Sequence, residues 1–130
     1  MIGLDSNVLV RYLTQDDELQ SKIATRVVDR FTAESPGYLP LVALAETVWV
    51  LKRGYRVSRS RIADIVDMLL NSSDLIIEDR PAVHFALRIY RATTADFGDA
   101  LIAFSAERAG CVETVTFDKA AAEHCGMRLL

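Results

Sequence analysis

Residues 2–10 place a short apolar run directly before three polar residues and the start of a helical pattern. A run this short and this apolar suits a strand that is buried on both faces. Ser6 or Asn7 can cap the helix that follows, whose apolar residues recur at helical spacing. Asp5 therefore stands at the carboxyl end of a strand, where ligands bind in doubly wound sheets. Taken alone, Asp5 is explained equally well as a simple helix cap.

Short strand patterns and helical patterns alternate along the rest of the chain. Further strands are expected at residues 38–40, 75–77, 114–118 and 127–130. Helices are expected over residues 18–34, 41–52, 61–70 and 119–124. Two more are expected between them: one begins near Pro81, and the next ends at Gly110. This alternation predicts an α/β fold in one domain covering residues 1–130. We expect a central, mostly parallel, twisted sheet of about four to five strands, with helices on both faces.

Composition narrows the class of protein. With 51% hydrophobic residues in 130, the chain is able to bury a real core, and a disordered chain is excluded. Two cysteines do not form a disulfide framework. No stretch is long and apolar enough to span a bilayer, and the first residues lack the basic segment of a signal peptide. We therefore expect a cytoplasmic protein that makes no contact with a membrane.

The net charge of −3 hides an uneven distribution of charge. Residues 52–61 carry five positive charges and no acid. This stretch is either a surface that contacts phosphates or a solvated loop with charged ends. Trp49 and Tyr55 could stack on bases, although Trp49 fits the core better. The candidates for nucleic-acid contact are Arg53, Arg56 and Arg59.

Five acidic residues lie at strand ends, within an apolar helix or together at the start of a helix. Asp5 and Asp118 each end a predicted strand, and Glu46 interrupts a helix that is apolar almost all round. Asp96 and Asp99, three residues apart, share one face at the start of a helix. Each has a plain explanation alone, as a cap, as a partner of the helix dipole or as half of a surface ion pair. Gathered at one end of the sheet, these carboxylates would repel one another, and a divalent cation such as Mg²⁺ or Mn²⁺ would relieve that repulsion.

Other chemistries fit these residues less well. The sequence has no phosphate-binding loop of the GxxxxGK type and no serine in a GxSxG turn. A haloacid-dehalogenase-type phosphatase needs a second Asp at the position of Asn7. A receiver domain could use the pair Glu78 and Asp79 after a middle strand, but that scheme leaves Glu46 unexplained.

Four segments, taken together, resemble the PIN-domain family and, within it, the VapC toxins of toxin–antitoxin pairs. They read IGLDSNVLVRYL, ALAETVWVLKR, DFGDALIAFSA and TFDKAA, and they follow the family's order and spacing along essentially the whole chain. The resemblance implies a PIN-like domain. It assigns the catalytic acids to Asp5, Glu46, Asp99 and Asp118, and it adds Asp96 as a further metal ligand. Ser6, Asn7 and Thr116 would support the site, with Ser6 where many members have Thr.

The resemblance implies a Mg²⁺- or Mn²⁺-dependent endoribonuclease toxin that inhibits translation. A metal-activated water would attack the RNA phosphodiester. Its partners would be a cognate antitoxin, RNA and a second copy of the chain, and the first two helices and the helix over residues 61–70 are candidate contact surfaces. A non-catalytic PIN-like module that binds RNA or an antitoxin is the alternative, with a phosphatase or receiver-like domain as a third hypothesis.

Overall fold

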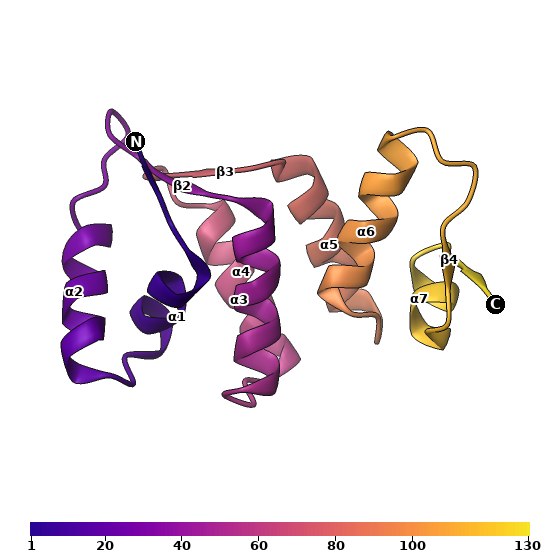
Figure 1. Cartoon of the computed structure of the whole chain (residues 1–130), viewed down its shortest axis with the longest axis horizontal. Helices are drawn as coiled ribbons and strands as arrows, with labels where there is room; N and C mark the ends of the chain where they lie inside the picture. Colours follow the sequence, from indigo (N-terminus) through magenta and orange to yellow (C-terminus); the bar gives the residue numbers. More distant parts are fainter.

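A computed structural model describes all 130 residues and shows helices and short strands in the predicted alternation (Figure 1). In chain order the elements are β1 (Ile2–Gly3), α1 (Ser6–Thr14), α2 (Glu18–Val28), β2 (Gly37–Leu39), α3 (Leu41–Arg53), α4 (Arg59–Leu70), β3 (Leu75–Ile77), α5 (Arg80–Ala92), α6 (Phe97–Arg108), β4 (Val115–Thr116), α7 (Lys119–His124) and β5 (Arg128–Leu129). Every predicted element is present. The prediction of a helix over residues 18–34 was too long, because the chain leaves the helix after Val28 so that Phe31 can enter the core.

The five strands form two separate parallel sheets. The larger has the order β1-β2-β3, in which Gly37 pairs with both Ile2 and Leu75. The smaller consists of β4 and β5, with Val115 opposite Arg128. The α/β class and the parallel pairing are as predicted, but the strands that were expected in one sheet are divided between two. The outer side of β1 pairs with no strand of the same chain, so β4 and β5 form a sheet of their own.

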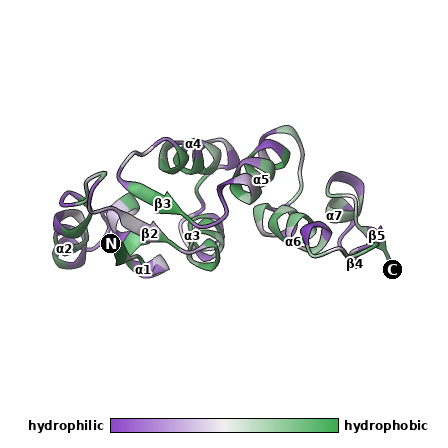
Figure 2. Ribbon diagram, turned by 90° about the horizontal axis from the view of Figure 1, so that it is seen from above, coloured by the Kyte–Doolittle hydropathy of each residue, from purple (hydrophilic) through white to green (hydrophobic).

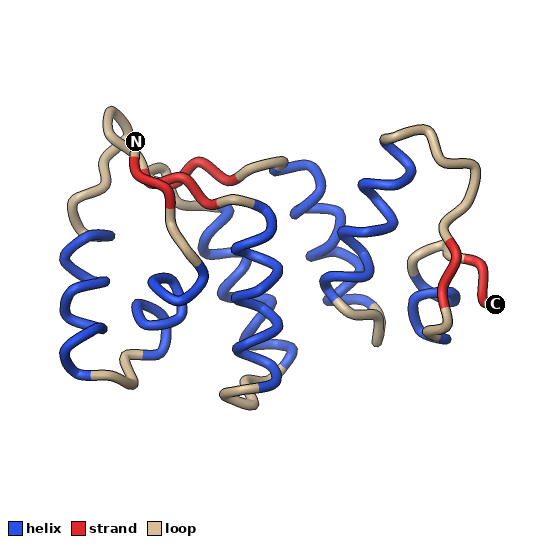
Figure 3. The backbone as a smooth tube through the Cα atoms, viewed as in Figure 1, coloured by secondary structure: helices blue, strands red, loops and turns tan.

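Helices cover one face of the larger sheet. Figure 3 shows its three strands above helices α1, α3 and α4, and Leu75 and Ile77 of β3 are buried in the core. The opposite face carries Gly3, Tyr38 and Ile76, which the strand register places side by side. Ile76 is 46% exposed, and a side chain at Gly3 would meet nothing within 4 Å. The expectation of helices on both faces is therefore wrong for this part of the sheet.

The hydrophobic core is one large cluster that includes residues from α1, α3, α4, α5, α6, β2 and β3, together with Leu4, which follows β1. Its fully buried members include Leu44 of α3 and Tyr90 of α5. A second cluster holds only Ala103, Ala121 and Met127, and it joins α7 and the approach to β5 to α6. The packing is therefore extensive in the first two-thirds of the chain and sparse at its end.

Local hydrogen bonds explain where several helices begin. Asp17, Ser58, Asp79 and Asp118 each accept a hydrogen bond from a backbone N–H in the first turn of the helix that they precede. Helix α3 follows Pro40, which has no capping side chain, and there the Glu78 carboxylate at the end of β3 accepts the N–H of Leu41 at 2.7 Å. None of the helices combines the length and the hydropathy that crossing a bilayer requires.

Candidate functional site

The first group of predicted site residues lies where β1 passes into α1. Asp5 precedes α1, and its carboxylate accepts the backbone N–H of Ser6 at 2.8 Å. The Ser6 hydroxyl donates to the Glu46 carboxylate at 2.8 Å, although the two residues are 40 positions apart in the chain. This bond joins the start of α1 to the exposed face of α3. Asn7 is exposed on α1 and forms no side-chain hydrogen bond.

The second group lies at the start of α6 and at the end of β4. Asp96 precedes α6 and forms a 3.0 Å ion pair with Lys52 at the end of α3. Asp99 lies in the first turn of α6, where it is partly buried. Asp118 follows β4, accepts the N–H of Ala121 at 2.8 Å and donates its own N–H to the Thr116 hydroxyl at 3.0 Å. This bond connects the Thr116 side chain to the backbone of Asp118.

Electrostatics link the members of this second group. Burial raises the pKa of Asp99 above its ordinary value, and the charges of Asp96 and Asp118 raise it further. Lys52 opposes this shift, because its positive charge favours the ionised carboxylate. Asp96 and Asp118 are thus close enough to Asp99 for their charges to act on it. Asp5 and Glu46 do not contribute to the shift at Asp99.

The predicted acids therefore form two groups within one chain. Carboxylate oxygens are suitable donors for Mg²⁺ or Mn²⁺, so the residue types match the expected cofactor. Their arrangement does not: no three His, Cys, Asp or Glu side chains stand close enough to hold a metal ion. Since the five acids of a single copy do not form a metal centre, we derive no catalytic step through an ion from this arrangement.

Comparison with known proteins identifies the family. The sequence profile of the PIN domain matches residues 2–126. The chain belongs to the PIN-domain family. It is also similar to a VapC ribonuclease of Aquifex aeolicus (strain VF5), with 26% identity over 116 residues, which cover 89% of this chain and 86% of that protein. The α/β class and the resemblance found in the sequence segments are thereby confirmed.

The basic stretch of this PIN domain divides into buried and exposed arginines. Arg59 is half-buried, and one of its terminal nitrogens donates to the backbone carbonyls of Tyr90, Thr93 and Ala95 at 2.8–3.0 Å. Its guanidinium also lies 3.8 Å from the centre of the Tyr90 ring. Arg59 thus holds α4 against the end of α5, and this structural role occupies the side chain that was predicted to contact RNA.

Arg53 and Arg56 are exposed and form no ion pair, so they remain the two candidates for phosphate contact in this stretch. Arg56 adopts a φ of 51°, a conformation that places it in the tight loop between α3 and α4. Trp49 is 59% exposed, which contradicts the interpretation that it belongs to the core. It lies three positions after Glu46, on the same face of α3.

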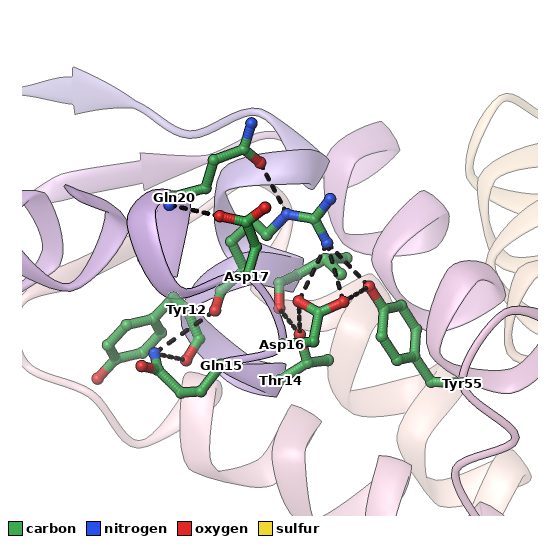
Figure 4. Close-up of polar contacts among 9 residues, drawn as sticks. Tyr12, Thr14, Gln15, Asp16, Asp17, Gln20 and Tyr55 are labelled. Atoms are coloured by element: carbon green, nitrogen blue, oxygen red, sulfur yellow. Dashed lines mark hydrogen bonds and ion pairs between the residues drawn. The ribbon is translucent and has the colours of Figure 1, made fainter. Parts of the chain in front are cut away.

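Tyr55, the other aromatic residue considered for base stacking, belongs to a polar cluster instead (Figure 4). Its hydroxyl donates to Asp16 at 2.5 Å, and Arg11 donates to both of these side chains at 3.0 Å. Thr14 donates to the same carboxylate. The hydrogen bonds from Tyr55 and Thr14, assisted by the charge of Arg11, lower the pKa of Asp16 to about 2. The cluster fixes the loop after α3 onto the end of α1.

Two charged residues near the candidate site were not predicted. Lys52 is the cation that faces Asp96 and Asp99, whereas the sequence interpretation placed it in a phosphate-contact surface. Its position directly after buried Leu51, in the last turn of α3, was a weak signal. Glu78 caps α3 from the end of β3 and lines a groove of about 720 Å³ between α3 and α6. No sequence pattern predicts a cap that comes from 37 residues away.

Proposed function

We propose that this PIN domain is an endoribonuclease of the VapC type, which hydrolyses phosphodiester bonds in RNA and thereby inhibits translation. The observation that carries the proposal is the combination of a PIN-domain match over residues 2–126 with similarity to a VapC ribonuclease over most of both chains. The carboxylates Asp5, Glu46, Asp99 and Asp118 are the proposed catalytic residues. Ser6 and Thr116 support the proposal, because each forms a hydrogen bond to a proposed site acid or its backbone.

We further propose that the enzyme depends on Mg²⁺ or Mn²⁺, with Asp96 as an additional ligand beside the four catalytic acids. Hard divalent cations prefer carboxylate oxygens, and the pKa of Asp99 is raised first by burial and then by the negative charges of Asp96 and Asp118. A bound cation would lower that pKa and favour the ionised carboxylate. Lys52, which is paired with Asp96, reduces the same excess of charge in the absence of the ion.

The partners proposed for the protein are RNA, a cognate antitoxin and a second copy of the chain, all in the cytoplasm. For the antitoxin, the structure offers a groove of about 450 Å³ between α1 and α2, whose lining is largely apolar. Exposed Ile23 contributes to its wall, and Arg11 provides a positive charge at its side. An amphipathic segment with an acidic residue would match this lining.

The direct test is RNA cleavage by purified protein free of antitoxin. Cleavage should occur with Mg²⁺ or Mn²⁺, stop when EDTA is added and resume when excess metal is restored. Asp5→Asn and Asp99→Asn together should abolish it, whereas Asp64→Asn should not, because Asp64 only pairs with Arg91 on the surface. Undiminished cleavage by the Asp5/Asp99 double variant would show that these residues do not form the active site.

A non-catalytic binding module is the second candidate, and one observation favours it. A single copy brings no three acids close enough to hold an ion. A binding module would retain RNA or antitoxin with the same affinity in EDTA and in Mg²⁺, and no cleavage product would form in either buffer. Calorimetric titration with Mg²⁺ separates the two candidates, since only the nuclease needs a specific metal site.

A further inference from the structure

Strand β1 lies at the edge of the larger sheet, and its outer side has no partner. The backbone N–H groups of Ile2 and Leu4 both donate toward β2, to the carbonyls of Pro36 and Tyr38. Since hydrogen-bonding direction alternates along a strand, the N–H and C=O of Gly3 point to the open side. Unpaired groups along an exposed edge are a template for the addition of another strand.

Strand β4 has an open edge of the same kind. The N–H groups of Arg128 and Leu130 donate to the carbonyls of Thr114 and Thr116, so these two residues of the β4 segment face β5. By the same alternation, the backbone groups of Val115 and Phe117 face away from β5. The side chain of Phe117 is 82% exposed. An exposed aromatic residue beside a free strand edge marks a surface that another chain can cover.

These two edges lie at opposite ends of one molecule. In Figures 1 and 2, β1 lies beside α1 and α2, while β4, α7 and β5 lie beyond α6 at the other end. Helices α3, α4, α5 and α6 stand between the two ends in both views. Arg59, which is bonded to the turn between α5 and α6, and the Lys52–Asp96 ion pair hold α6 in this position. Both edges can be paired without breaking these contacts if β4 comes from a second copy.

We propose that two copies of this chain exchange their C-terminal strands, so that β4 of each copy pairs in parallel with β1 of the other. The free groups define the register: the Gly3 N–H donates to the Val115 carbonyl, and the Phe117 N–H donates to the Gly3 carbonyl. Thr116 then stands beside Gly3. The resulting sheet has the order β5-β4-β1-β2-β3, and the exchange is reciprocal about a two-fold axis.

The open face of the larger sheet supports the same assembly. One face of this sheet is not covered by helices of the same chain. That is the face on which Ile76 is exposed and on which Gly3 has free space beside it. Helix α6 buries Phe97 and Leu101, yet its Ile102, on another face, is 56% exposed. Exchange would cover the open face of the sheet with such a helix from the second copy.

Exchange also brings the two groups of acids together. Asp5 stands two residues after Gly3, and Asp118 stands two residues after Thr116, so this register places the two carboxylates side by side at the carboxyl ends of adjacent strands. Each complete site then contains Asp5 and Glu46 of one copy with Asp99 and Asp118 of the other. This consequence rests on the proposed function, whereas the pairing of the strands does not.

Cysteine cross-linking tests the pairing without any measurement of activity. The background is Cys111→Ser with Cys125→Ala, which removes both free thiols. One chain carries Gly3→Cys and another carries Thr116→Cys. Neighbouring strands lie about 4.8 Å apart, within the Cα separation that a disulfide bridges. After the two chains are unfolded and refolded together, mild oxidation should give a disulfide-linked mixed dimer on a non-reducing gel.

The matched control replaces Gly3→Cys with Ile76→Cys on the far strand of the same face, and it should give no mixed dimer with Thr116→Cys. A chain that carries both Gly3→Cys and Thr116→Cys should also cross-link between copies. A disulfide within a single chain, without mixed dimers, would show that β4 closes onto its own β1 and would overturn the exchange. Absence of either disulfide, with both chains folded by circular dichroism, would overturn the pairing itself.

Activity tests the shared site. Asp5→Asn and Asp118→Asn chains should each be inactive alone. Refolded together, half of the dimers contain one of each chain and one of their two sites is intact, so about a quarter of the wild-type rate should return. No recovery, with an active wild type, would overturn the shared site. If the wild type itself does not cut RNA while the cross-link forms, the exchange stands and the proposed function fails.

Discussion

Residues 2–92 and residues 111–130 are held in place in different ways. The first region shares one large core, in which side chains from four helices and two strands are buried. The second region has a two-stranded sheet, a six-residue helix and a core cluster that it shares with one residue of α6. Two short strands with so little core are marginal by themselves. The comparison indicates that the C-terminal region depends on what it docks against, whereas the larger region is stable in itself.

The largest expected effect comes from removing core volume in each region. Leu44→Ala should lower the free energy of unfolding by about 2–5 kcal/mol, because Leu44 is completely buried in the large cluster. Met127→Ala should cost only about 1 kcal/mol, because it unpacks a small peripheral cluster. Urea denaturation followed by circular dichroism measures both values. Equal costs would show that the C-terminal region belongs to the same cooperative core.

The second prediction asks whether both regions supply the candidate site. Asp5→Asn in the first region and Asp118→Asn in the second should each reduce RNA cleavage by about 100-fold, since even groups that only support metal ligands contribute 10- to 100-fold. Glu113→Gln is the control in the second region, because its carboxylate binds only Arg128. Initial rates with a fluorogenic RNA measure the effect. A normal rate for Asp118→Asn would show that the second region supplies no catalytic residue at this position.

The third prediction concerns the link between α4 and the turn that precedes α6. Arg59→Lys should lower the free energy of unfolding by about 2 kcal/mol, because lysine cannot reproduce the guanidinium contacts with three carbonyls and the Tyr90 ring. Arg56→Lys is the matched control, and it should change stability by less than about 0.5 kcal/mol. Thermal unfolding measures both. If the two variants are equally stable, the Arg59 contacts do not hold these helices together.

Local signals in the sequence predicted most of the fold. Apolar spacing located every helix and strand, and Asp118 was predicted correctly as a helix cap. The division of the strands into two sheets could not be predicted, because the pattern of Ile2 and Gly3 does not say which chain pairs with their outer side. Residue types suggested the candidate acids, but only tertiary structure shows that Glu46 bonds to Ser6 while Asp96 bonds to Lys52.

Arg59 shows where reasoning from composition fails. Five positive charges in ten residues indicate a surface, and the sequence gives no sign that one of them is taken up by backbone carbonyls. The carbonyls of Tyr90, Thr93 and Ala95 become available because the chain ends α5 there, more than 30 residues later. Trp49 shows the converse, since an apolar pattern predicted burial on a face of α3 that no element of the same chain covers.

The smallest expected effects distinguish two carboxylates by the sign of their pH dependence. The folded-state pKa of Asp16 is lowered to about 2 by Tyr55 and Thr14, so its ionised form adds stability above the unfolded value of 3.8. That contribution is lost as the pH falls from 3.8 toward about 2. The pKa of Asp99 is raised by burial and by Asp96 and Asp118, so its ionised form costs stability at neutral pH, and the cost disappears as the pH falls through the raised value toward 3.8.

In metal-free protein at pH 7, Asp16→Asn should therefore lower the melting temperature slightly and Asp99→Asn should raise it slightly. Both differences from wild type should shrink at acidic pH, that of Asp99→Asn first, because its raised pKa is reached earlier as the pH falls. Differential scanning calorimetry between pH 3 and pH 7 measures the two trends. Added Mg²⁺ should reverse the sign for Asp99→Asn alone, since the neutral amide removes a charged ligand from the proposed ion while Asp16 lies in the polar cluster at the end of α1. A fall in melting temperature for metal-free Asp99→Asn would show that its carboxylate is stabilised rather than crowded.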